Sequence, residues 1–369
     1  MGMMRMIVKL DDVCKRASSS IKQSDVIGKS GDYPIYGAAG YIGNVDFYHQ
    51  EKPYVAVVKD GAGIGRTMLL PAKSSVIGTM QYLIPKPNIS AEYLRYVVQH
   101  MRLEKYYSGA TIPHIYFRDY KEEQFNLSSP EEQAQIVCAL KKVERIIGKR
   151  QHQLSALDDL IKARFVGMFG KQNPSWPIVT IGEICRDTRT GPFGSALHHD
   201  EFVDDGIFVL GIDNAVENKF SYNRMRYITE EKYQQLKRYT VHPGDVIITI
   251  MGTIGRSAVI PDDIPLAINT KHLACLTPDY TRVNSEFLCS AFQMHPDVQR
   301  QLTGNAKGAI MDGLNLGIIK GLKFQLPPLQ MQEDFQLFYA QIDKSKSAVQ
   351  KSLDETQLLF DSLMQKYFG

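Results

Sequence analysis

The sequence predicts an α+β protein whose two similar domains are joined by two long antiparallel helices that pair as a coiled coil. Three observations support this. Residues 129–164 carry apolar side chains at heptad spacing and, after Pro130, lack proline and contain only one glycine, Gly148. The last segment of the chain, residues 327–368, repeats that pattern. The stretches that precede the two helices also repeat each other, which indicates two copies of one domain-plus-helix module.

The first long helix is predicted to begin at Ser129. Serine is a favourable cap, Pro130 suits the first helical position, and Glu131 faces the positive end of the helix. Its apolar residues fall on two heptad rows: Ile136, Val143 and Leu157 on one, and Leu140, Ile147, Leu154 and Ile161 on the other. A helix with so narrow an apolar stripe needs a partner helix.

The second long helix supplies that partner. An offset of 199 residues aligns Gln133 with Gln332 and Phe169 with Phe368. The apolar rows of the second copy are Phe335, Ile342, Val349 and Leu363, and Tyr339, Leu353 and Phe360. Residues 129–170 hold seven Lys/Arg against five Asp/Glu, whereas residues 324–369 hold four against six, so opposite charge favours pairing between the helices. If Ile147 lies opposite Lys346, Arg150 comes near Asp343.

The globular repeat sets the domain boundaries. Corresponding segments of the two copies include residues 8–15 and 179–186, residues 64–66 and 254–256, and residues 92–94 and 286–288. We predict a first domain over 1–128, the first long helix over 129–170, a second domain over 171–323, and the second long helix over 324–369. The length of 369 residues accommodates two domains of ordinary size.

Each domain is predicted to contain a strongly twisted or barrel-like sheet and one flanking helix. Residues 54–58 form a buried strand, and 67–70 resume a strand after a glycine-rich turn. The flanking helices are expected over 90–107, with Ser90 as its cap, and over 285–295. A loop is expected over 303–310.

Composition is that of an ordinary soluble protein, with 44% hydrophobic and 22% charged residues and a net charge of +3. No apolar run approaches the ~20 residues of a membrane span, and the N-terminal residues lack a signal core. The five cysteines form no CxxC pair, which indicates reduced thiols. We therefore expect a cytoplasmic protein without membrane association.

Three motifs suggest chemistry, but each has a simpler interpretation. The glycines of 61–65 precede a strand, whereas a phosphate site needs a helix N-terminus. The Asn-Pro-Ser-Trp motif at 173–176 suggests a catalytic site, but it lies in a linker between the domains. His198-His199-Asp200 suggests a metal site, but no second cluster at metal-ligand spacing accompanies it. The sequence thus predicts no catalytic residue, no metal site and no cofactor.

The polar loop residues are better candidates for contacts to nucleic acid. Lys, Arg, Asn, Gln, Ser and Thr side chains reach base edges and phosphates, and basic residues bunch locally in the second domain. The predicted DNA-contacting residues are Tyr41, Asn44, Lys59, Gln81, Thr111, His114 and Arg118 in the first domain, and Arg189, Thr190, Ser195, His198, Arg224, Arg226, Lys271, Asn305 and Lys307 in the second.

The whole pattern resembles the specificity subunit of type I restriction–modification systems. The resemblance rests on two variable domains, each followed by a long helix, and on the helix entry Phe324-Gln-Leu-Pro-Pro-Leu-Gln-Met-Gln332. It implies two target-recognition domains related by an approximate two-fold axis. It also implies that the methyltransferase subunits, two of them, and the restriction subunits are separate chains.

The function expected from this organisation is recognition of double-stranded DNA without catalysis. Two domains held by stiff helices contact base edges a set distance apart, which predicts an asymmetric bipartite site whose half-site spacing is set by the helices. Two alternatives remain open: a self-contained DNA-modifying enzyme with an unrecognised motif, and a coiled-coil scaffold that binds only protein.

Overall fold

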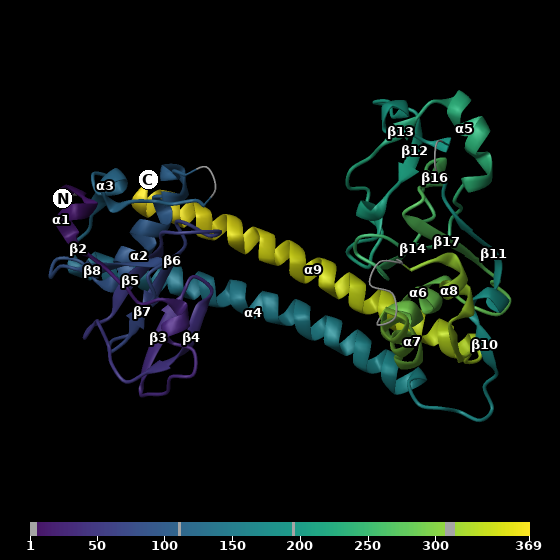
Figure 1. Cartoon of the computed structure of the whole chain (residues 1–369), viewed down its shortest axis with the longest axis horizontal. Helices are drawn as coiled ribbons and strands as arrows, with labels where there is room; N and C mark the ends of the chain where they lie inside the picture. Colours follow the sequence, from purple (N-terminus) through teal and green to yellow (C-terminus); the bar gives the residue numbers. More distant parts are fainter. Residues whose placement is uncertain (1–5, 110–111, 194–195, 307–313) are drawn as a thin grey trace. The chain divides into compact units, whose positions relative to one another are not determined.

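The computed structural model describes residues 6–109, 112–193, 196–306 and 314–369 (Figure 1). The chain divides into two compact units, one formed by residues 1–152 with 350–369 and the other by residues 153–349. Both long helices, α4 (Pro130–Phe169) and α9 (Leu329–Phe368), contribute a segment to each unit. Each unit is therefore a sheet-containing domain with parts of two helices attached.

The first unit contains three sheets. Strands β1 (Met6–Lys9) and β9 (Gln124–Leu127) form an antiparallel pair. A four-stranded sheet has the order β2-β8-β5-β6, with bounds Cys14–Ser18, Met80–Pro85, Tyr54–Val58 and Thr67–Leu70. A three-stranded sheet has the order β4-β3-β7, with bounds Gly40–Val45, Tyr33–Gly37 and Ser75–Val76. The helical elements are α1 (Leu10–Val13), η1 (Gln23–Asp25), α2 (Ala91–His100), η2 (Leu103–Tyr106) and α3 (Phe117–Tyr120).

The second unit repeats this topology. Strands β10 (Ile178–Thr180) and β18 (Lys323–Gln325) pair, and the four-stranded order is β11-β17-β14-β15, with bounds Cys185–Thr190, Leu273–Pro278, Val246–Thr249 and Ser257–Val259. The three-stranded order is β13-β12-β16, with bounds Tyr227–Ile228, Ile207–Leu210 and Ala267–Asn269. The helical elements are η3 (Ile181–Ile184), η5 (His199–Glu201), η6 (Ile212–Asn214), α5 (Glu230–Leu236), η7 (Lys237–Tyr239), α6 (Ser285–Met294), α7 (Pro296–Ala306) and α8 (Leu316–Gly321).

The match between the units extends to strand direction. The central strand β3 pairs antiparallel with β4 and parallel with β7, and its counterpart β12 pairs antiparallel with β13 and parallel with β16. The predicted internal repeat is therefore confirmed as a repeat of sheet topology. The predicted twisted or barrel-like sheet takes the form of separate hydrogen-bonded sheets in each domain.

The long helix α4 begins as the sequence predicts. Ser129 and Glu132 form a reciprocal capping box: the Glu132 N–H donates to Ser129 Oγ (3.2 Å), and the Ser129 N–H donates to Glu132 Oε2 (3.1 Å). The helix continues to Phe169, five residues beyond the heptad run that ends near Arg164, because Phe165 and Phe169 are buried in the core of the second unit. All thirteen residues assigned to helix packing are buried or half-buried; they are Ile136, Leu140, Val143, Ile147, Leu154, Leu157, Ile161, Phe335, Tyr339, Ile342, Val349, Leu353 and Phe360.

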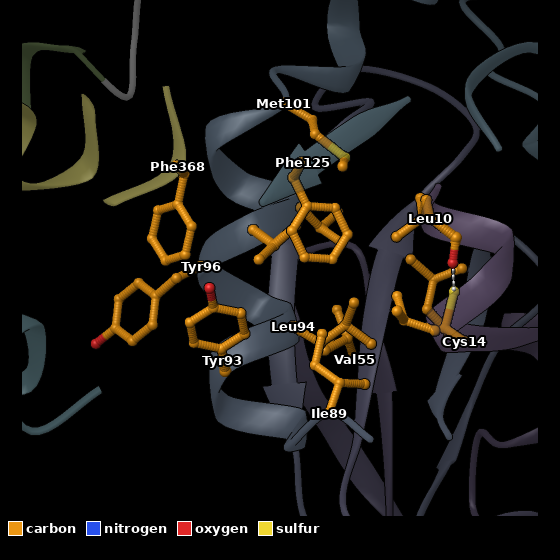
Figure 2. Packing of buried hydrophobic residues seen from close by; sticks show 14 of the residues in the cluster. Leu10, Cys14, Val55, Ile89, Tyr93, Leu94, Tyr96, Met101, Phe125 and Phe368 are labelled. Atoms are coloured by element: carbon orange, nitrogen blue, oxygen red, sulfur yellow. Dashed lines mark hydrogen bonds between the residues drawn. The ribbon is translucent and has the colours of Figure 1, made fainter. Parts of the chain in front are cut away.

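In the first unit, helix α2 lies between the four-stranded sheet and the long helices. Its buried Tyr93 ring packs on Phe368 of α9, with ring centroids 5.3 Å apart (Figure 2). Tyr96 of the same helix packs on Phe360 of α9. The start of α4 joins the same cluster through Leu140, while Val55 of β5 closes it from the sheet side. Burying aromatic side chains of this size is a large stabilising contribution.

In the second unit, α6 occupies the corresponding position. The Phe287 ring of α6 lies 5.0 Å from that of Phe169 at the end of α4, and the Phe165 ring lies 5.1 Å from that of Phe335 near the start of α9. The two helix segments run antiparallel here, since Lys346 forms an ion pair with Asp158 while Phe335 meets Phe165. Local helix pairing is thus part of the core of each domain.

Three details differ from the sequence predictions. Helix α2 ends at His100, because Arg102 takes a left-handed conformation (φ 50°), and a 3-10 turn follows. Helix α7 begins at Pro296, a favourable first position, and extends into the region predicted as a loop. The expected pairing of Arg150 with Asp343 is wrong: the Asp343 carboxylate accepts from Lys219 (3.0 Å), and Lys346 pairs with Asp158.

A buried histidine makes the stability of the second unit depend on pH. His295 is 2% exposed between Phe165 and Phe324, and its Nδ1 accepts the N–H of Asp297 (3.2 Å). Desolvation lowers the pKa of His295, and the nearby Arg300 charge adds to this, whereas Asp297 opposes it. As the pH falls below about 6.5, His295 therefore takes up a proton in the unfolded chain before it does so in the folded chain. The free energy of unfolding is fully present above about pH 6.5 and decreases as the pH falls toward the lower pKa that His295 has in the folded chain.

We predict that the free energy of unfolding of the second unit decreases between pH 7 and pH 5, with a shallower slope in His295→Gln. Fluorescence of Trp176, the single tryptophan, reports on this unit because Trp176 packs against the same core. An equal slope in the variant would contradict the assignment.

Candidate nucleic-acid interface

In the first domain, two loops that are distant in the sequence form one surface. The Gly61 N–H donates to the Pro113 carbonyl and the Ile115 N–H donates to the Lys59 carbonyl, both at 2.9 Å. Lys59 and Asp60 directly follow the buried strand β5, so the sheet fixes their position. The backbone bonds thereby hold the 59–61 turn against residues 113–115.

The side chains on this surface form a connected series. Asp60 accepts from Lys59 (3.1 Å) and pairs with His114 Nδ1 (2.7 Å). The Tyr116 ring stacks on His114, with centroids 6.3 Å apart, and the Arg118 guanidinium lies 4.8 Å from the Tyr116 ring centroid. The Arg118 side chain is 77% exposed. We call Lys59, His114, Tyr116 and Arg118 the first-domain loop surface; its cations and aromatic faces can contact phosphates and bases.

The glycine-rich turn beside this surface is a hairpin, as predicted. Strands β5 and β6 pair antiparallel, with Val57 opposite Thr67. Gly65 has φ +81°, and a Cβ there would lie 2.8 Å from the Glu104 nitrogen, so only glycine fits. Arg66 Nη1 donates to the Ala38 carbonyl (3.0 Å), which ties the hairpin to the β3–β4 turn. On β4, the exposed Tyr41 hydroxyl donates to Asn44 Oδ1 (3.0 Å), so the two predicted contacts Tyr41 and Asn44 lie together.

Gln81 does not share this exposure. It lies in β8, the second strand of the four-stranded sheet, and its side chain is 2% exposed. An amide buried there does not reach DNA in this conformation, so Gln81 is not part of the interface. Thr111 lies outside the described residues.

The second domain gathers its cations around one carboxylate. Arg226 Nη2 donates to Asp213 Oδ2 (2.6 Å), and Arg224 Nη1 lies 3.7 Å from Asp213 Oδ1. The 270–272 segment joins them, since the Thr270 N–H donates to the Leu210 carbonyl (3.1 Å) and the Val209 N–H donates to the Arg226 carbonyl (2.8 Å).

His272 reports how close these charges are. Desolvation lowers its pKa, and the neighbouring Lys271 and Arg226 cations lower it further. The imidazole is therefore neutral near pH 7, with one nitrogen able to donate and the other to accept. Arg224 is 75% exposed. We call Arg224, Arg226, Lys271 and His272 the second-domain loop surface.

Arg189, by contrast, is a structural residue. Its side chain is only 13% exposed, and Nη2 donates to the fully buried Asp245 carboxylate (2.6 Å) and to the Thr240 carbonyl (2.7 Å). Nη1 donates to Asp187 and Thr277. The guanidinium is therefore committed to an internal network, and the sequence could not distinguish it from the exposed arginines nearby.

The remaining predicted contacts are scattered. Thr190 is half-buried at the end of β11. His198 is exposed, and its backbone N–H donates to the Glu201 carboxylate. Ser195, Lys307 and the side chain of Asn305 lie outside the described residues. The residues missed from sequence are the acids that orient the cations. Asp60 adjoins Lys59 and could have been suspected, whereas Asp213 is thirteen residues from Arg226, and no sequence pattern joins them.

Among residues 6–109, 112–193, 196–306 and 314–369, no group of three or more His, Cys, Asp or Glu is placed to hold a metal ion. Within the same ranges, no helix is both long enough and apolar enough to cross a membrane.

Exposed cations and aromatic rings on loops of a duplicated α+β domain are typical of a nucleic-acid-recognition protein. Residues 5–156 and 174–355 match a protein family whose description is "Type I restriction modification DNA specificity domain". The chain therefore belongs to this family, and the family predicted from the sequence is confirmed.

Two curated specificity subunits are similar in sequence. The type I restriction enzyme EcoBI specificity subunit of Escherichia coli is 25% identical over 197 residues, 52% of this chain and 41% of that protein. The MjaVIII specificity subunit of Methanocaldococcus jannaschii is 22% identical over 297 residues, 76% of this chain and 69% of that protein. The match thus spans less than half of the EcoBI subunit.

Two solved structures share the fold. A type I restriction–modification S subunit from M. genitalium aligns with a TM-score of 0.61 at 17% identity, covering 99% of this chain and 96% of that one. A chain from a study of complex assembly and conformational transition of the type I system aligns with a TM-score of 0.59 at 14% identity, covering 98% and 97%. At these identities the likeness establishes the fold alone.

Replacing Arg189 tests its structural role. We predict that Arg189→Leu lowers the free energy of unfolding of the second unit by about 3–5 kcal/mol, because the buried Asp245 charge loses its partner. The matched control is Arg300→Leu, which removes an exposed ion pair with Asp297 and is expected to cost less than about 1 kcal/mol. Urea unfolding followed by Trp176 fluorescence measures both, and similar costs would contradict the buried-pair account.

Proposed function

We propose that this chain is the DNA-recognition subunit of a type I restriction–modification complex and reads an asymmetric bipartite site. In this proposal residues 1–128 and 171–323 are the two target-recognition domains. The observation that carries it is the contrast between one scaffold and two different loop surfaces. The sheets repeat strand for strand, while the first domain presents Lys59, His114, Tyr116 and Arg118 and the second presents Arg224, Arg226, Lys271 and His272.

The chemistry of the two surfaces suits two different half-sites. The first combines cations with the stacked rings of His114 and Tyr116, which favours apolar and stacking contacts as well as phosphate contacts. The second combines two arginines and a lysine with a neutral histidine, which favours hydrogen bonds to base edges and phosphates. Different surfaces on one scaffold account for an asymmetric target.

The spacing between half-sites is proposed to come from the long helices. Each helix has 40 residues, which at 1.5 Å per residue corresponds to about 60 Å. Their proposed arrangement is an antiparallel coiled coil with an approximate two-fold relation between the two copies. Such a pair holds two domains at one span, so that only half-sites with one spacer length are contacted together.

Catalysis is proposed to belong to partner chains, namely two methyltransferase subunits and, through the assembled complex, the restriction subunits. The related structure from a study of complex assembly concerns such a system. Exposed apolar residues on the long helices, such as Ile146, Leu358 and Leu359 in the first unit, are proposed contacts for these partners. The complex is proposed to act in the cytoplasm and to need no cofactor held by this chain.

The direct test is methylation mapping with the purified chain and its methyltransferase partner. We expect methylation at one bipartite sequence, and exchange of residues 1–128 for those of another specificity subunit should change one half-site and leave the other. Methylation at a single contiguous sequence would contradict the bipartite model. Methyl transfer by the isolated chain would favour an enzyme, and a complex without sequence-dependent DNA affinity would favour a protein-binding scaffold.

The second-domain loop surface can be tested by its salt dependence. We predict that Arg224→Gln and Lys271→Gln each weaken DNA binding by the complex and reduce the slope of log K against log salt concentration by about one if the residue contacts a phosphate. The control Arg300→Gln removes an equally exposed arginine on α7 and should leave the slope unchanged. Slopes that match the unmodified complex would remove these residues from the interface.

A further inference from the structure

A buried glutamine joins the first domain to the start of α4. Gln133 is 2% exposed, and its Oε1 accepts the Ser90 N–H (3.0 Å) at the cap of α2. Its Nε2 donates to the carbonyls of Asn88 (2.9 Å) and Ser128 (3.0 Å). One side chain therefore links the first turn of α4, the turn that enters α2, and the segment between β9 and α4.

The second domain has the same arrangement. Gln332 is fully buried, and its Oε1 accepts the Asn284 N–H (2.9 Å) at the cap of α6. Its Nε2 donates to the carbonyls of Arg282 (3.2 Å) and Pro327 (2.8 Å). The three bonded backbone groups lie at corresponding places in the two copies. In each copy they are the N–H of the residue that caps the flanking helix, the carbonyl two residues before that cap, and the carbonyl five residues before the glutamine.

Both donors and the acceptor of each amide are thus engaged. Removing such a side chain leaves one backbone N–H and two backbone carbonyls, in part-buried or buried positions, without this partner. The arrangement recurs although the neighbouring polar contacts differ, with Arg95 pairing with Glu144 in the first unit and Asn284 Nδ2 donating to Gln336 in the second. Its recurrence points to a requirement shared by both joints.

That requirement is orientation. The core of each joint is apolar, formed by side chains such as Tyr93 and Phe368, or Phe287 and Phe169. Other polar contacts, including the bond that Tyr96 donates to Glu144 in the first unit, occur in one joint only. The buried glutamine is the polar contact that both joints share. Close-packed apolar contacts resist sliding of the helix, but they specify its angle less sharply than hydrogen bonds do, because they are non-directional. Hydrogen bonds have narrow angular preferences, and three bonds from one planar amide admit one placement of the helix against the cap.

We propose that Gln133 and Gln332 are positioning residues that fix the angle between each domain and the long helices, and thereby the spacer length that the complex accepts. This inference rests on the proposed bipartite recognition. Neither glutamine contacts DNA in this account; each acts through the orientation of its domain. A purely stabilising role would lower activity on all sites alike, whereas a positioning role changes the preference among sites.

The test is a series of DNA substrates with the two half-sites separated by the native spacer or by one base pair more or less. The full complex is assembled with Gln133→Met or Gln332→Met, which keep the length of the side chain but remove its hydrogen bonds. The control is Gln135→Met, which makes the same replacement at an exposed glutamine two residues after Gln133 on α4. For each complex, the methylation rate on the native spacer divided by the rate on each altered spacer gives a selectivity ratio.

We expect the selectivity for the native spacer to fall about tenfold in either glutamine variant and to stay unchanged in the control. An equal loss on all three spacers, or an unchanged ratio, would overturn the proposal. If Gln133→Met does not assemble, Gln133→Asn is measured in the same series, since it keeps a neutral amide but is one methylene too short to make all three bonds.

Hydrogen–deuterium exchange separates failure of this inference from failure of the proposed function. In Gln133→Met the amide of Ser90 should lose protection while that of Asn284 keeps it, and Gln332→Met should give the reverse pattern. Unchanged protection in both variants would contradict the hydrogen-bond geometry itself. If the unmodified complex methylates no bipartite site but protection changes as expected, the proposed function fails and the joint geometry stands.

Discussion

The structure depends on the burial of aromatic side chains where each flanking helix meets the long helices. In the first unit this is the packing of Tyr93 and Tyr96 on Phe368 and Phe360, and in the second the cluster of Phe165, Phe169, Phe287 and Phe335. Long helices with a narrow apolar stripe are marginal by themselves. Here their ends gain stability by completing the cores of two domains, so that helix and domain fold as parts of one unit.

The two domains show how one scaffold accommodates different interiors. In the four-stranded sheets, Leu83 and Leu276 hold equivalent register positions. Beside them the first domain has the ring pair Tyr54 and Tyr82, with centroids 5.1 Å apart, where the second has Asp245 next to Cys275 and bonded to Arg189. An aromatic pair and a buried ion pair fill the same place. A backbone that tolerates this exchange inside also tolerates unlike loops outside.

The sequence predicted the repeat, the strand at 54–58, the hairpin after it, the cap of α4 and the family. These features follow from local patterns: heptad spacing, a run of β-branched residues, a serine before proline and acid, and matched anchors in two copies. What it could not predict depends on distant contacts. Whether an arginine is exposed or paired with a buried carboxylate separates Arg224 from Arg189, and no local pattern reports it. The same holds for Gln81, which resembles a loop contact in sequence but lies inside the sheet.

The long helices raise a related point about the limits of local patterns. Heptad rows identified the residues that face inward, but the register between helices is set by the domain cores and by ion pairs such as Lys346 with Asp158. This is why a register argued from a single seam position, Lys346 opposite Ile147, gave the wrong partner for Asp343.

The central claim is that the paired helices keep two DNA-recognition domains at one fixed span. The most direct measurement is a distance distribution between spin labels on exposed residues, one at Lys52 in the first domain and one at Lys237 in the second, with the exposed Cys138 and the half-buried Cys185 replaced by serine. The account predicts one narrow distribution, in the free chain and in the complex with its methyltransferase partner alike. A broad distribution, or several populations, would contradict it.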